Sequence, residues 1–420
     1  MLHYENDKIK SLLLKGKIGL EKESLRITAD GHMAHSVHPF KGDKYIVRDF
    51  CENQTEINTP PLNDAHEATE FLAECSERIE KVIAQNNEYL WPFSNPPYII
   101  NEKDIPIAKY DDDEKEKENY RYYLADRYGR YKMTFSGIHF NYSFSEDLLK
   151  AEFELLDTNI SFEEYKSRFY LELAGKMQMY NWLVVAITAA SPLLDSSYFE
   201  KKVYDRDVFN GMSSTRCSEC GYWNYFTPVL KFESIDEYAN AIEKYIDAGL
   251  IRSSSELYFP VRLKPPGVNS LKNLRKKGVS HIELRMIDLN PLVKSGIEEK
   301  DVLFIQLLLV YLACMDAPHP SVCEQIMSIQ NTKNAARYDL KTVKILLSEG
   351  KSLSVINAAK QVIEKMYEFY KDYPDYIKKA VEFQYEKFTE NPKNRYSWQI
   401  RERFGGGFVK KGLKYIKERQ

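Results

Sequence analysis

Apolar and polar residues alternate along several short segments of the chain, and this pattern predicts β-strands with one apolar and one polar face. Residues i and i+2 of a strand point to the same face, so each segment sets its charged residues side by side. For any one strand, the same alternation is typical of a sheet with one face in water. The predicted strands are 18–27, 45–58, 133–144, 256–263 and 280–288.

Apolar residues spaced three and four apart predict the helices. The clearest helical segment follows a candidate N-cap at Asn63-Asp64 and runs to about residue 90. The longest apolar run, 302–315, contains Gln306 and is too short to span a bilayer, so we expect a buried helix there. Further helices are expected over 4–15, 111–130, 162–190 and 235–248, and over nearly all of the chain after residue 298.

The order of these elements favours an α+β fold. Strands come in pairs with helices added between them, without the regular βαβα alternation of a doubly wound fold, so an antiparallel sheet is expected. The sequence contains no internal repeat and no obvious linker. We therefore expect residues 1–420 to form a single catalytic unit, with 330–420 as its helical C-terminal part.

Composition narrows the class of protein. The chain has 420 residues, a formal charge of −3 and 13% aromatic residues, which argues against disorder and gives no electrostatic footprint for nucleic acid. The N-terminus shows no secretory signal, and six scattered cysteines suit a reduced, cytoplasmic protein that is not bound to a membrane. Cys217 and Cys220 form a lone CxxC, read as two ordinary thiols, with zinc binding or a redox pair as alternatives.

The polar faces of the predicted strands carry carboxylates, imidazoles, amides and an arginine. Like charges side by side on one face repel each other unless a cation lies over them. Oxygen ligands with an occasional histidine suit Mg²⁺ or Mn²⁺, and carboxylates around hard cations are typical of nucleotide phosphate binding and phosphoryl transfer. The residues are Glu21 and Glu23; Glu52, Gln54 and Glu56 with Asp49 just outside; His139, Asn141 and Ser143; and His281, Glu283 and Arg285, with Met286 on the apolar face.

Glycine-rich phosphate loops are not the expected route to a nucleotide. The sequence has neither GxxxxGK[ST] nor a strand-linked GxGxxG. Gly405-Gly406-Gly407 lies among helices and is read as a turn, with a phosphate cradle near Lys410 and Lys411 as the alternative. ATP binding, if present, is expected through metal ions and arginines.

Six motifs occur in an order and spacing that resemble a known family. They are IGLEKESLRI, WPFSNPPYI, YRYYLADRYGRYKMTFSGIHFNYSF, STRCSECGYWN, SELYFPVRLKP and HIELRMIDLNP. Together, over about residues 15–320, they resemble the bacterial glutamate–cysteine ligases, both the stand-alone type and the front module of bifunctional glutathione synthetases.

The resemblance implies a fold, an activity and a set of ligands. The expected fold is a glutamine-synthetase-like antiparallel sheet that forms a funnel-shaped active site, surrounded by helices. The expected activity is ATP-dependent joining of the glutamate γ-carboxylate to the cysteine amine through γ-glutamyl phosphate, the first step of glutathione biosynthesis. ATP would be a co-substrate and Mg²⁺ the metal, with Mn²⁺ as an alternative.

The resemblance also assigns residues, motif by motif. The metal ligands would be Glu21, Glu23, Asp49, Glu56, His139 and Glu283. Arg285 would lie against the ATP phosphates as a catalytic residue, and Arg216 would be both catalytic and substrate-binding. The amino-acid pockets would be lined by Phe50, Tyr120, Arg121, Tyr222 and Tyr258.

Departures from the family pattern keep parts of this assignment open. Met133 stands where a polar residue is expected in the acceptor pocket, so a related carboxylate–amine ligase with another amine remains an alternative. A non-catalytic protein that binds Mg²⁺ and nucleotide is a third hypothesis, although every charged motif position is retained. No ATP-grasp module follows, so we do not expect this chain to make glutathione itself, and the nucleotide contacts of 330–420 stay unassigned.

Overall fold

An antiparallel sheet forms the centre of the protein. The structure, a computed structural model, describes residues 1–199, 203–347 and 350–419. Within these ranges seven strands form one sheet in the order β2-β3-β1-β5-β9-β8, and β4 pairs with the far part of β1. The strands are β1 (Gly16–Thr28), β2 (Ile46–Arg48), β3 (Gln54–Asn58), β4 (Glu88–Leu90), β5 (Gly137–Phe144), β8 (Val261–Lys264) and β9 (His281–Asp288).

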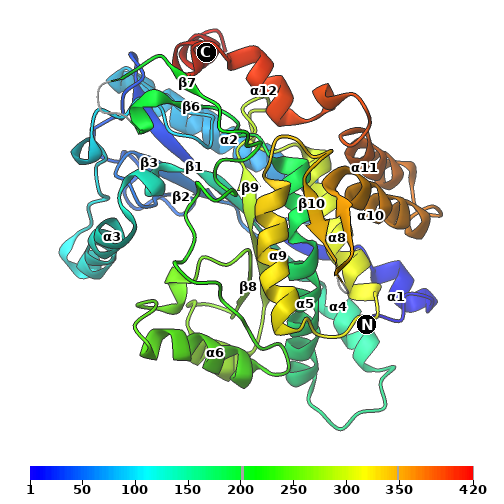
Figure 1. Ribbon diagram of the computed structural model, residues 1–420. Coiled ribbons are helices and arrows are strands. Elements are labelled where there is room, and N and C mark those ends of the chain that lie inside the picture. The colour runs from blue at the N-terminus through cyan, green and yellow to red at the C-terminus, as the bar shows by residue number, and fades with distance from the viewer. Residues whose placement is uncertain (200–202, 348–349, 420) are drawn as a thin grey trace.

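Helices cover the apolar face of this sheet. Long helix α5 (Phe162–Thr188) contacts β8 and β9, while α2 (Ala65–Ile83) contacts β1 and β4. Helices α8 (Glu299–Cys314) and α9 (Val322–Ala335) pack against α5, and Figure 1 shows the three together on one side of the sheet. Helix α8 is buried around most of its circumference, which confirms the buried helix expected from the apolar run. The α+β architecture with an antiparallel sheet is thereby confirmed.

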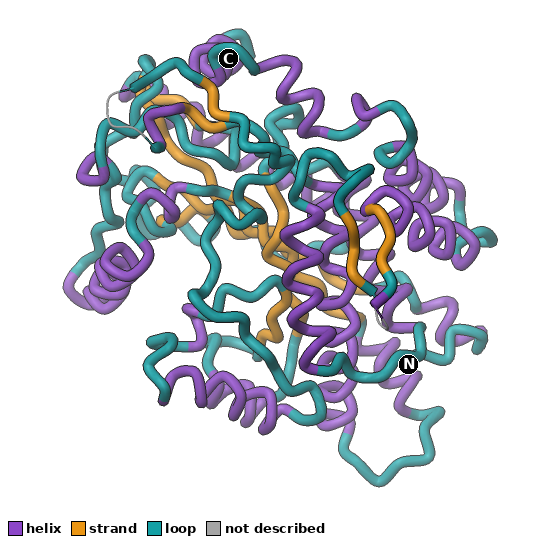
Figure 2. Tube along the Cα trace, viewed as in Figure 1, coloured by secondary structure: helices purple, strands orange, loops and turns teal. Residues whose placement is uncertain are grey.

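The remaining elements surround this core, and Figure 2 shows how much of the chain between them is loop. None of the helices formed by the described residues has both the length and the apolar character needed to cross a membrane. The bounds are α1 (Asp7–Leu12), α3 (Lys115–Tyr128), α4 (Glu146–Phe153), α6 (Ile235–Asp247), α7 (Leu271–Lys277), α10 (Val355–Phe369), α11 (Asp375–Glu386), α12 (Tyr396–Phe404), α13 (Phe408–Lys417), β6 (Leu194–Asp195), β7 (Asp207–Val208), β10 (Lys344–Leu346) and β11 (Ser352–Ser354).

Contrary to the expectation from sequence, the C-terminal part is not wholly helical. Strands β10 and β11 form a small antiparallel pair, seen in Figure 1 beside α9. Asn331 on α9 fixes it, because its side-chain amide accepts from Leu346 N at 2.7 Å and donates to Leu346 O at 2.8 Å. One helix side chain thus satisfies both backbone groups of an edge strand, a tertiary contact that no local sequence pattern reveals.

A second apolar cluster joins the N-terminal and C-terminal parts of the chain. The ring of Phe408, the first residue of α13, lies 5.0 Å from Phe93 and 5.6 Å from Trp91, measured between ring centroids. Phe50 belongs to the same buried cluster. The WPF segment, which sequence analysis could only describe as irregular, is therefore held in place by the last two helices.

Two irregularities shape the polar face. The expected strand 45–58 is broken into β2 and β3 by a turn, closed by Gln54 N donating to Cys51 O at 3.0 Å. In β9, the pairing with β5 shifts by one residue between Ile138 and Phe140. Such a bulge re-aims side chains. As a result Met286, expected on the apolar face, lines a cavity on the same side as Arg285.

Candidate active site

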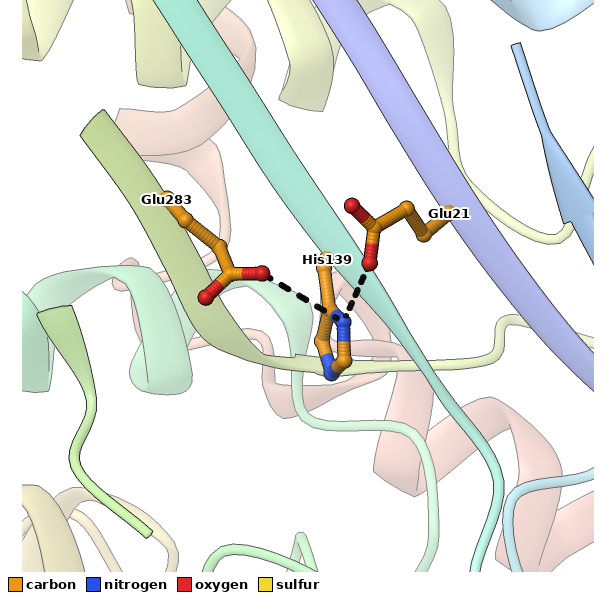
Figure 3. A group of neighbouring side chains, drawn as sticks. All are labelled: Glu21, His139 and Glu283. Atoms are coloured by element: carbon orange, nitrogen blue, oxygen red, sulfur yellow. Dashed lines mark hydrogen bonds and ion pairs between the residues drawn. The ribbon is translucent and has the colours of Figure 1, made fainter. Parts of the chain in front are cut away.

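Glu21, His139 and Glu283 come from three adjacent strands, and their side chains meet on the polar face of the sheet (Figure 3). Register places Glu21 opposite His139. Nδ1 of His139 lies 2.9 Å from Oε2 of Glu21 and 4.0 Å from Oε1 of Glu283. One candidate ligand atom from each residue lies within 4.8 Å of the others. Two carboxylates and an imidazole at this spacing form a candidate site for a divalent cation.

Glu23 and Glu56 extend this acidic cluster toward β3. They face each other in the β1–β3 register. Burial and the neighbouring Asp49 raise the pKa of Glu23 to about 8 and hold the pKa of Glu56 well above its usual range. Nε2 of His139 lies 3.9 Å from Oε1 of Glu23 and, among the described residues, has no hydrogen-bond partner. The donor set therefore fits a hard cation, which would offset the mutual repulsion of the carboxylates.

Glu283 is fully buried and carries its own positive partners. Nη1 of Arg285 lies 3.2 Å from Oε2, and Nζ of Lys264 lies 2.9 Å from Oε1. Burial opposes ionisation, but Arg285 and Lys264 outweigh it and hold the pKa of Glu283 well below its usual range. Lys264 was missed by sequence reasoning. One feature of the sequence could have indicated it: Lys264 ends the strand VRLK, and that strand, β8, pairs with the strand that carries Glu283.

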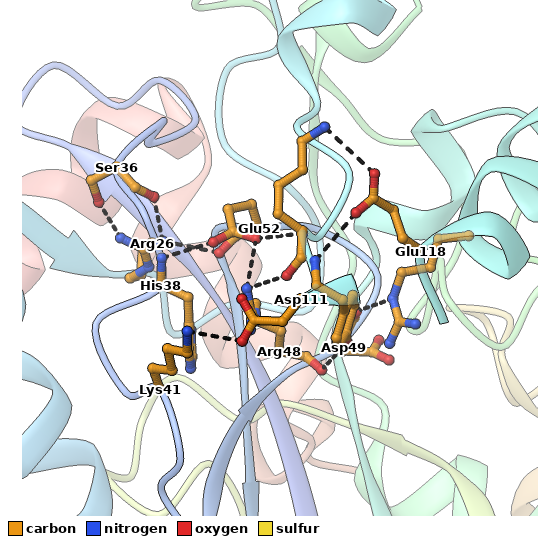
Figure 4. Close-up of polar contacts among 12 residues, drawn as sticks. Arg26, Ser36, His38, Lys41, Arg48, Asp49, Glu52, Asp111 and Glu118 are labelled. Atoms are coloured by element: carbon orange, nitrogen blue, oxygen red, sulfur yellow. Dashed lines mark hydrogen bonds and ion pairs between the residues drawn. The ribbon is translucent and has the colours of Figure 1, made fainter. Parts of the chain in front are cut away.

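Asp49 and Glu52 end up in different environments (Figure 4). The turn between β2 and β3 directs Glu52 away from the acidic cluster. Its carboxylate instead accepts from His38 N at 2.9 Å and from Lys109 N at 2.7 Å. Asp49 is near enough to Glu56 to be the leading charge that raises its pKa. The expectation that Glu52 shares a face with Glu56 is therefore wrong, because the strand begins only at Gln54.

Arg216 and Arg285 face a second, small cavity of about 20 Å³. Tyr222 and Tyr258 line it as well, with their ring centroids 4.8 Å apart and their planes nearly perpendicular. The guanidinium of Arg216, a residue that is 6% exposed, donates to Arg285 O at 2.9 Å. A planar guanidinium in an aromatic-walled cavity is suited to a carboxylate ligand.

Phe50, Tyr120 and Arg121 lie outside that cavity. Arg121 stacks on the ring of Tyr110 at 4.7 Å and donates to the backbone carbonyl of Asp49. The ring of Tyr120 stacks on that of Tyr123, also on α3, with 6.1 Å between the ring centroids. Phe50 is 4% exposed and belongs to the second apolar cluster. The structure thus places Arg121 beside Asp49 and leaves the amino-acid-pocket roles of all three residues as predictions.

A larger groove of about 430 Å³ opens from the other side of Glu21. It runs over the polar ends of β1, β3, β5 and β9, where side-chain amides, hydroxyls and cationic groups face it. These lining residues include Lys17, Glu21, Asn58, Asn141, Ser143 and His281. Glu21 therefore borders both the candidate metal site and a groove with the size of a small-molecule site.

The glycine run binds an anion that belongs to the chain itself. Oδ1 and Oδ2 of Asp207 accept from the backbone N–H groups of Gly406 at 2.6 Å, Gly407 at 3.2 Å and Phe408 at 2.8 Å. Gly406 and Gly407 have φ of +77° and +124°, which only glycine adopts readily. The run is therefore the N-terminal cap of α13, and its donors are taken by a carboxylate.

The six cysteines are free, and the CxxC pair shows no metal geometry. Cys217 is buried and its pKa is raised to about 12, chiefly by burial. Cys220 accepts from Nδ2 of Asn210 at 3.2 Å. Among the described residues neither cysteine belongs to a group of three or more possible metal ligands, so the structure gives no support to a zinc site here.

Comparison with known proteins identifies the family. Residues 2–249 and 225–335 match the glutamate-cysteine ligase family. The glutathione biosynthesis bifunctional protein GshAB of Clostridium perfringens is 32% identical over 400 residues, covering 90% of this chain and 51% of the relative. GshAB of Listeria innocua serovar 6a is 34% identical over 381 residues, covering 87% and 49%. The chain thus spans about half the length of these curated relatives.

Solved structures share the fold. A bifunctional glutathione synthetase from Pasteurella multocida superposes with a TM-score of 0.85 at 25% identity, over 99% of this chain and 53% of that one. A glutamate–cysteine ligase from Francisella tularensis in complex with AMP gives 0.86 at 22% identity, over 96% and 88%. The expected glutamine-synthetase-like architecture is confirmed by this likeness in fold. With its family match over most of residues 2–335, the chain belongs to the glutamate–cysteine ligase family.

Proposed function

We propose that this chain catalyses ATP-dependent ligation of the γ-carboxylate of L-glutamate to the amine of L-cysteine, giving γ-glutamylcysteine, ADP and phosphate. The observation that carries the proposal is the position of Glu283, which faces His139 on one side and Arg285 on the other. Arg285 in turn lines the cavity of Arg216. A candidate cation site and a candidate carboxylate site are thereby joined through two residues of one strand.

The acidic cluster would hold Mg²⁺, with Mn²⁺ as an alternative. Glu21, His139 and Glu283 would form one site, and Glu23, Glu56 and Asp49 would be the further ligands. A bound divalent cation supplies charge neutralisation for phosphoryl oxygens and a template for the nucleotide. The polar groove beside Glu21 is the place we propose for ATP, because it is the larger cavity that borders the cluster.

The arginines would carry the amino-acid side of the reaction. A carboxylate does not acylate an amine at neutral pH, because its oxygen is a poor leaving group. Transfer of the γ-phosphoryl group of ATP to the glutamate γ-carboxylate gives an acyl phosphate, which the amine of cysteine attacks with release of phosphate. Arg285 would neutralise the phosphoryl oxygens, and Arg216 would bind a substrate carboxylate with its planar fork. Tyr222 and Tyr258 would shape the pocket and exclude water.

Phosphate release tests this function directly. Purified protein is supplied with ATP and Mg²⁺, then with glutamate and cysteine together, and then with each amino acid omitted. Release that requires both amino acids, with γ-glutamylcysteine detected by mass, is the expected result. Binding of ATP without release under any combination would contradict the ligase and favour the non-catalytic nucleotide-binding protein.

Met133 favours consideration of an amine substrate other than cysteine. It is 6% exposed and sits in the same apolar cluster as Phe50, at a position where the family resemblance leads us to expect a polar group. An amine with a more apolar side chain than cysteine would suit that environment better. Release that needs glutamate and is faster with 2-aminobutyrate than with cysteine would identify such a related carboxylate–amine ligase.

We also propose a cytoplasmic location, with glutamate, cysteine and ATP as small-molecule partners and no role for nucleic acid or membrane. Six free thiols favour a reducing compartment. Residues 1–420 would act as one catalytic unit.

A further inference from the structure

Asp288, at the end of β9, is the anchor of a buried polar network; it lies within the motif HIELRMIDLNP, but sequence analysis gave it no role. Its Oδ2 accepts from Ala190 N at 2.9 Å and from Ser191 Oγ at 2.8 Å, and its Oδ1 accepts from Ser214 Oγ at 3.0 Å. The residue is 2% exposed. The carboxylate therefore ties the end of the sheet to the loop that begins at Ala189 and to the loop that carries Arg216.

The two loops are also bonded to each other. Ser191 O accepts from Thr215 Oγ1 at 2.7 Å, and Ser191 Oγ accepts from Thr215 N at 2.9 Å. Nδ2 of Asn95 donates to Ser191 O at 3.0 Å. Thr215 directly precedes Arg216, so this network fixes the backbone from which the guanidinium extends. Several hydrogen bonds that converge in this way restrict the geometry of the groups they hold.

Gly137 completes the seat of the guanidinium from the opposite strand. It is the cross-strand partner of Asp288 in the β5–β9 pairing. A Cβ atom on Gly137 would lie 2.4 Å from Cζ of Arg216, closer than non-bonded heavy atoms approach. Arg216 therefore occupies the space that a side chain at position 137 would fill. The backbone N–H of Gly137 donates to Oε2 of Glu23 at 2.9 Å.

The guanidinium of Arg216 does not use all of its hydrogen-bond donors in this position. Nη1 donates to Arg285 O at 2.9 Å and Ile287 O at 3.4 Å. Nε of Arg216 is buried and, within the described part of the chain, has no hydrogen-bond partner. A fixed, buried guanidinium with one unused donor beside a cavity is pre-organised for an anionic ligand, which explains why its position needs anchoring on both sides.

We propose that Gly137 and Asp288 are positioning residues for Arg216, and that this cross-strand pair sets the affinity of the enzyme for the glutamate carboxylate. The inference rests on the proposed function. Gly137 supplies the space for the guanidinium and Asp288 fixes the loop that delivers it. Neither residue touches substrate, so both act through Arg216.

Gly137→Ala is the sharpest test, because it keeps the N–H that binds Glu23 and changes only the space beside Arg216. We expect the KM for glutamate to rise at least tenfold, with the KM values for ATP and Mg²⁺ within twofold of wild type. Glutamate should also lose its ability to raise the melting temperature, a readout that needs no turnover. A glutamate KM within twofold of wild type in the folded variant would overturn the inference.

A double-mutant cycle isolates the contact. In an Arg216→Lys background, where the side chain ends in a slimmer ammonium, Gly137→Ala should change the glutamate KM by less than twofold. An equal cost in both backgrounds would show that the glycine acts elsewhere and would overturn its assigned role.

Asp288→Asn and Ser214→Ala test the other half of the pair and replace Gly137→Ala if that variant does not fold. Each should raise the glutamate KM several-fold. The matched control is Asp195→Asn, a buried carboxylate that accepts from Ser197 N and Asp205 N at 2.9 Å and has no link to Arg216. It should lower stability and leave that KM unchanged. If the wild-type protein shows no glutamate-dependent phosphate release, the proposed function is wrong. If the wild type is active but these variants keep its KM for glutamate, only this inference is wrong.

Discussion

The ammonium nitrogen of Lys264 lies 2.9 Å from Oε1 of Glu283, and the same oxygen lies 4.0 Å from Nδ1 of His139. An internal cation therefore sits against one of the candidate metal ligands. Since the ammonium and a divalent cation would both be attracted to this carboxylate oxygen, they compete for it.

Lys264→Met should tighten binding of a divalent cation. Removal of the ammonium frees Oε1 of Glu283 and takes away a positive charge from the site, so we expect roughly tenfold stronger binding, about 1.4 kcal/mol. The measurement is Mn²⁺ titration followed by electron paramagnetic resonance without nucleotide. Lys276→Met, at an exposed position of α7, is the control and should change nothing. Weaker Mn²⁺ binding in Lys264→Met would contradict the competition.

Glu21→Gln and Glu283→Gln should each abolish phosphate release while the protein remains folded. The amide keeps the shape of the side chain and removes the charge that a cation requires, so we expect losses of about a thousandfold or more in kcat. Circular dichroism checks the fold, and Glu164→Gln, on the exposed side of α5, is the control. Full activity in either variant would reject the metal-site assignment.

His38 should make stability depend on pH in the mildly acidic range. Burial, followed by the charges of Arg26 and Arg48, lowers its pKa to about 4. Asp43 is the facing acid. In the unfolded chain the pKa is about 6.5, so the unfolded state binds more protons between pH 6.5 and 4, and stability falls as the pH drops through that window.

The expected size of this effect is at most about 2 kcal/mol between pH 7.5 and 5. Chemical denaturation at both pH values measures it. His38→Gln cannot titrate and should show a drop smaller by that amount, relative to wild type. An equal pH dependence in the two proteins would show that the imidazole is not the titrating group.

Part of the candidate site was predictable from local pattern. The alternation around Glu21 and Glu23 is uninterrupted in β1, so period-two reasoning placed both carboxylates on one face correctly. The same reasoning failed at Glu52, because the turn before β3 depends on the bond from Gln54 N to Cys51 O and the local sequence still looks strand-like. Strand alternation is a local signal, whereas the limits of a strand depend on its partners.

Other features required the pairing of distant strands. The bulge in β9 becomes visible only in register with β5, and it decides that Met286 faces the cavity. Lys264 reads as an ordinary residue at a strand end until β8 is aligned with β9. Asp288 and Gly137 lie within quoted motifs but received no role from sequence analysis, for the same reason. Sequence patterns thus pointed to the candidate ligands, and tertiary structure was needed to find the residues that support them.

Asp301 and Lys387 form a buried ion pair away from the site, and its loss should destabilise the fold. The carboxylate accepts from Lys387 Nζ at 2.7 Å and Tyr396 Oη at 2.8 Å, with both charged side chains 1% exposed. Asp301→Ala leaves a buried ammonium unpaired, so we expect the free energy of unfolding to fall by about 3–5 kcal/mol.

Urea denaturation measures this loss, and kcat well below the melting temperature should be unchanged. The comparison is Glu154→Ala, which breaks the exposed pair with Lys8 and should cost less than about 1 kcal/mol. Similar losses in both variants would contradict the distinction between buried and exposed pairs.

The bond between Asp207 and the glycine run of α13 has a consequence for how the protein is made. The C-terminal residues of this contact also complete the apolar cluster that contains Phe50 and Trp91. A ribosome must therefore release α12 and α13 before the segments that flank the amino-acid side of the site can reach their final packing. During translation the early strands wait with an incomplete core, so a nascent chain halted before residue 396 presents this apolar surface to chaperones and proteases.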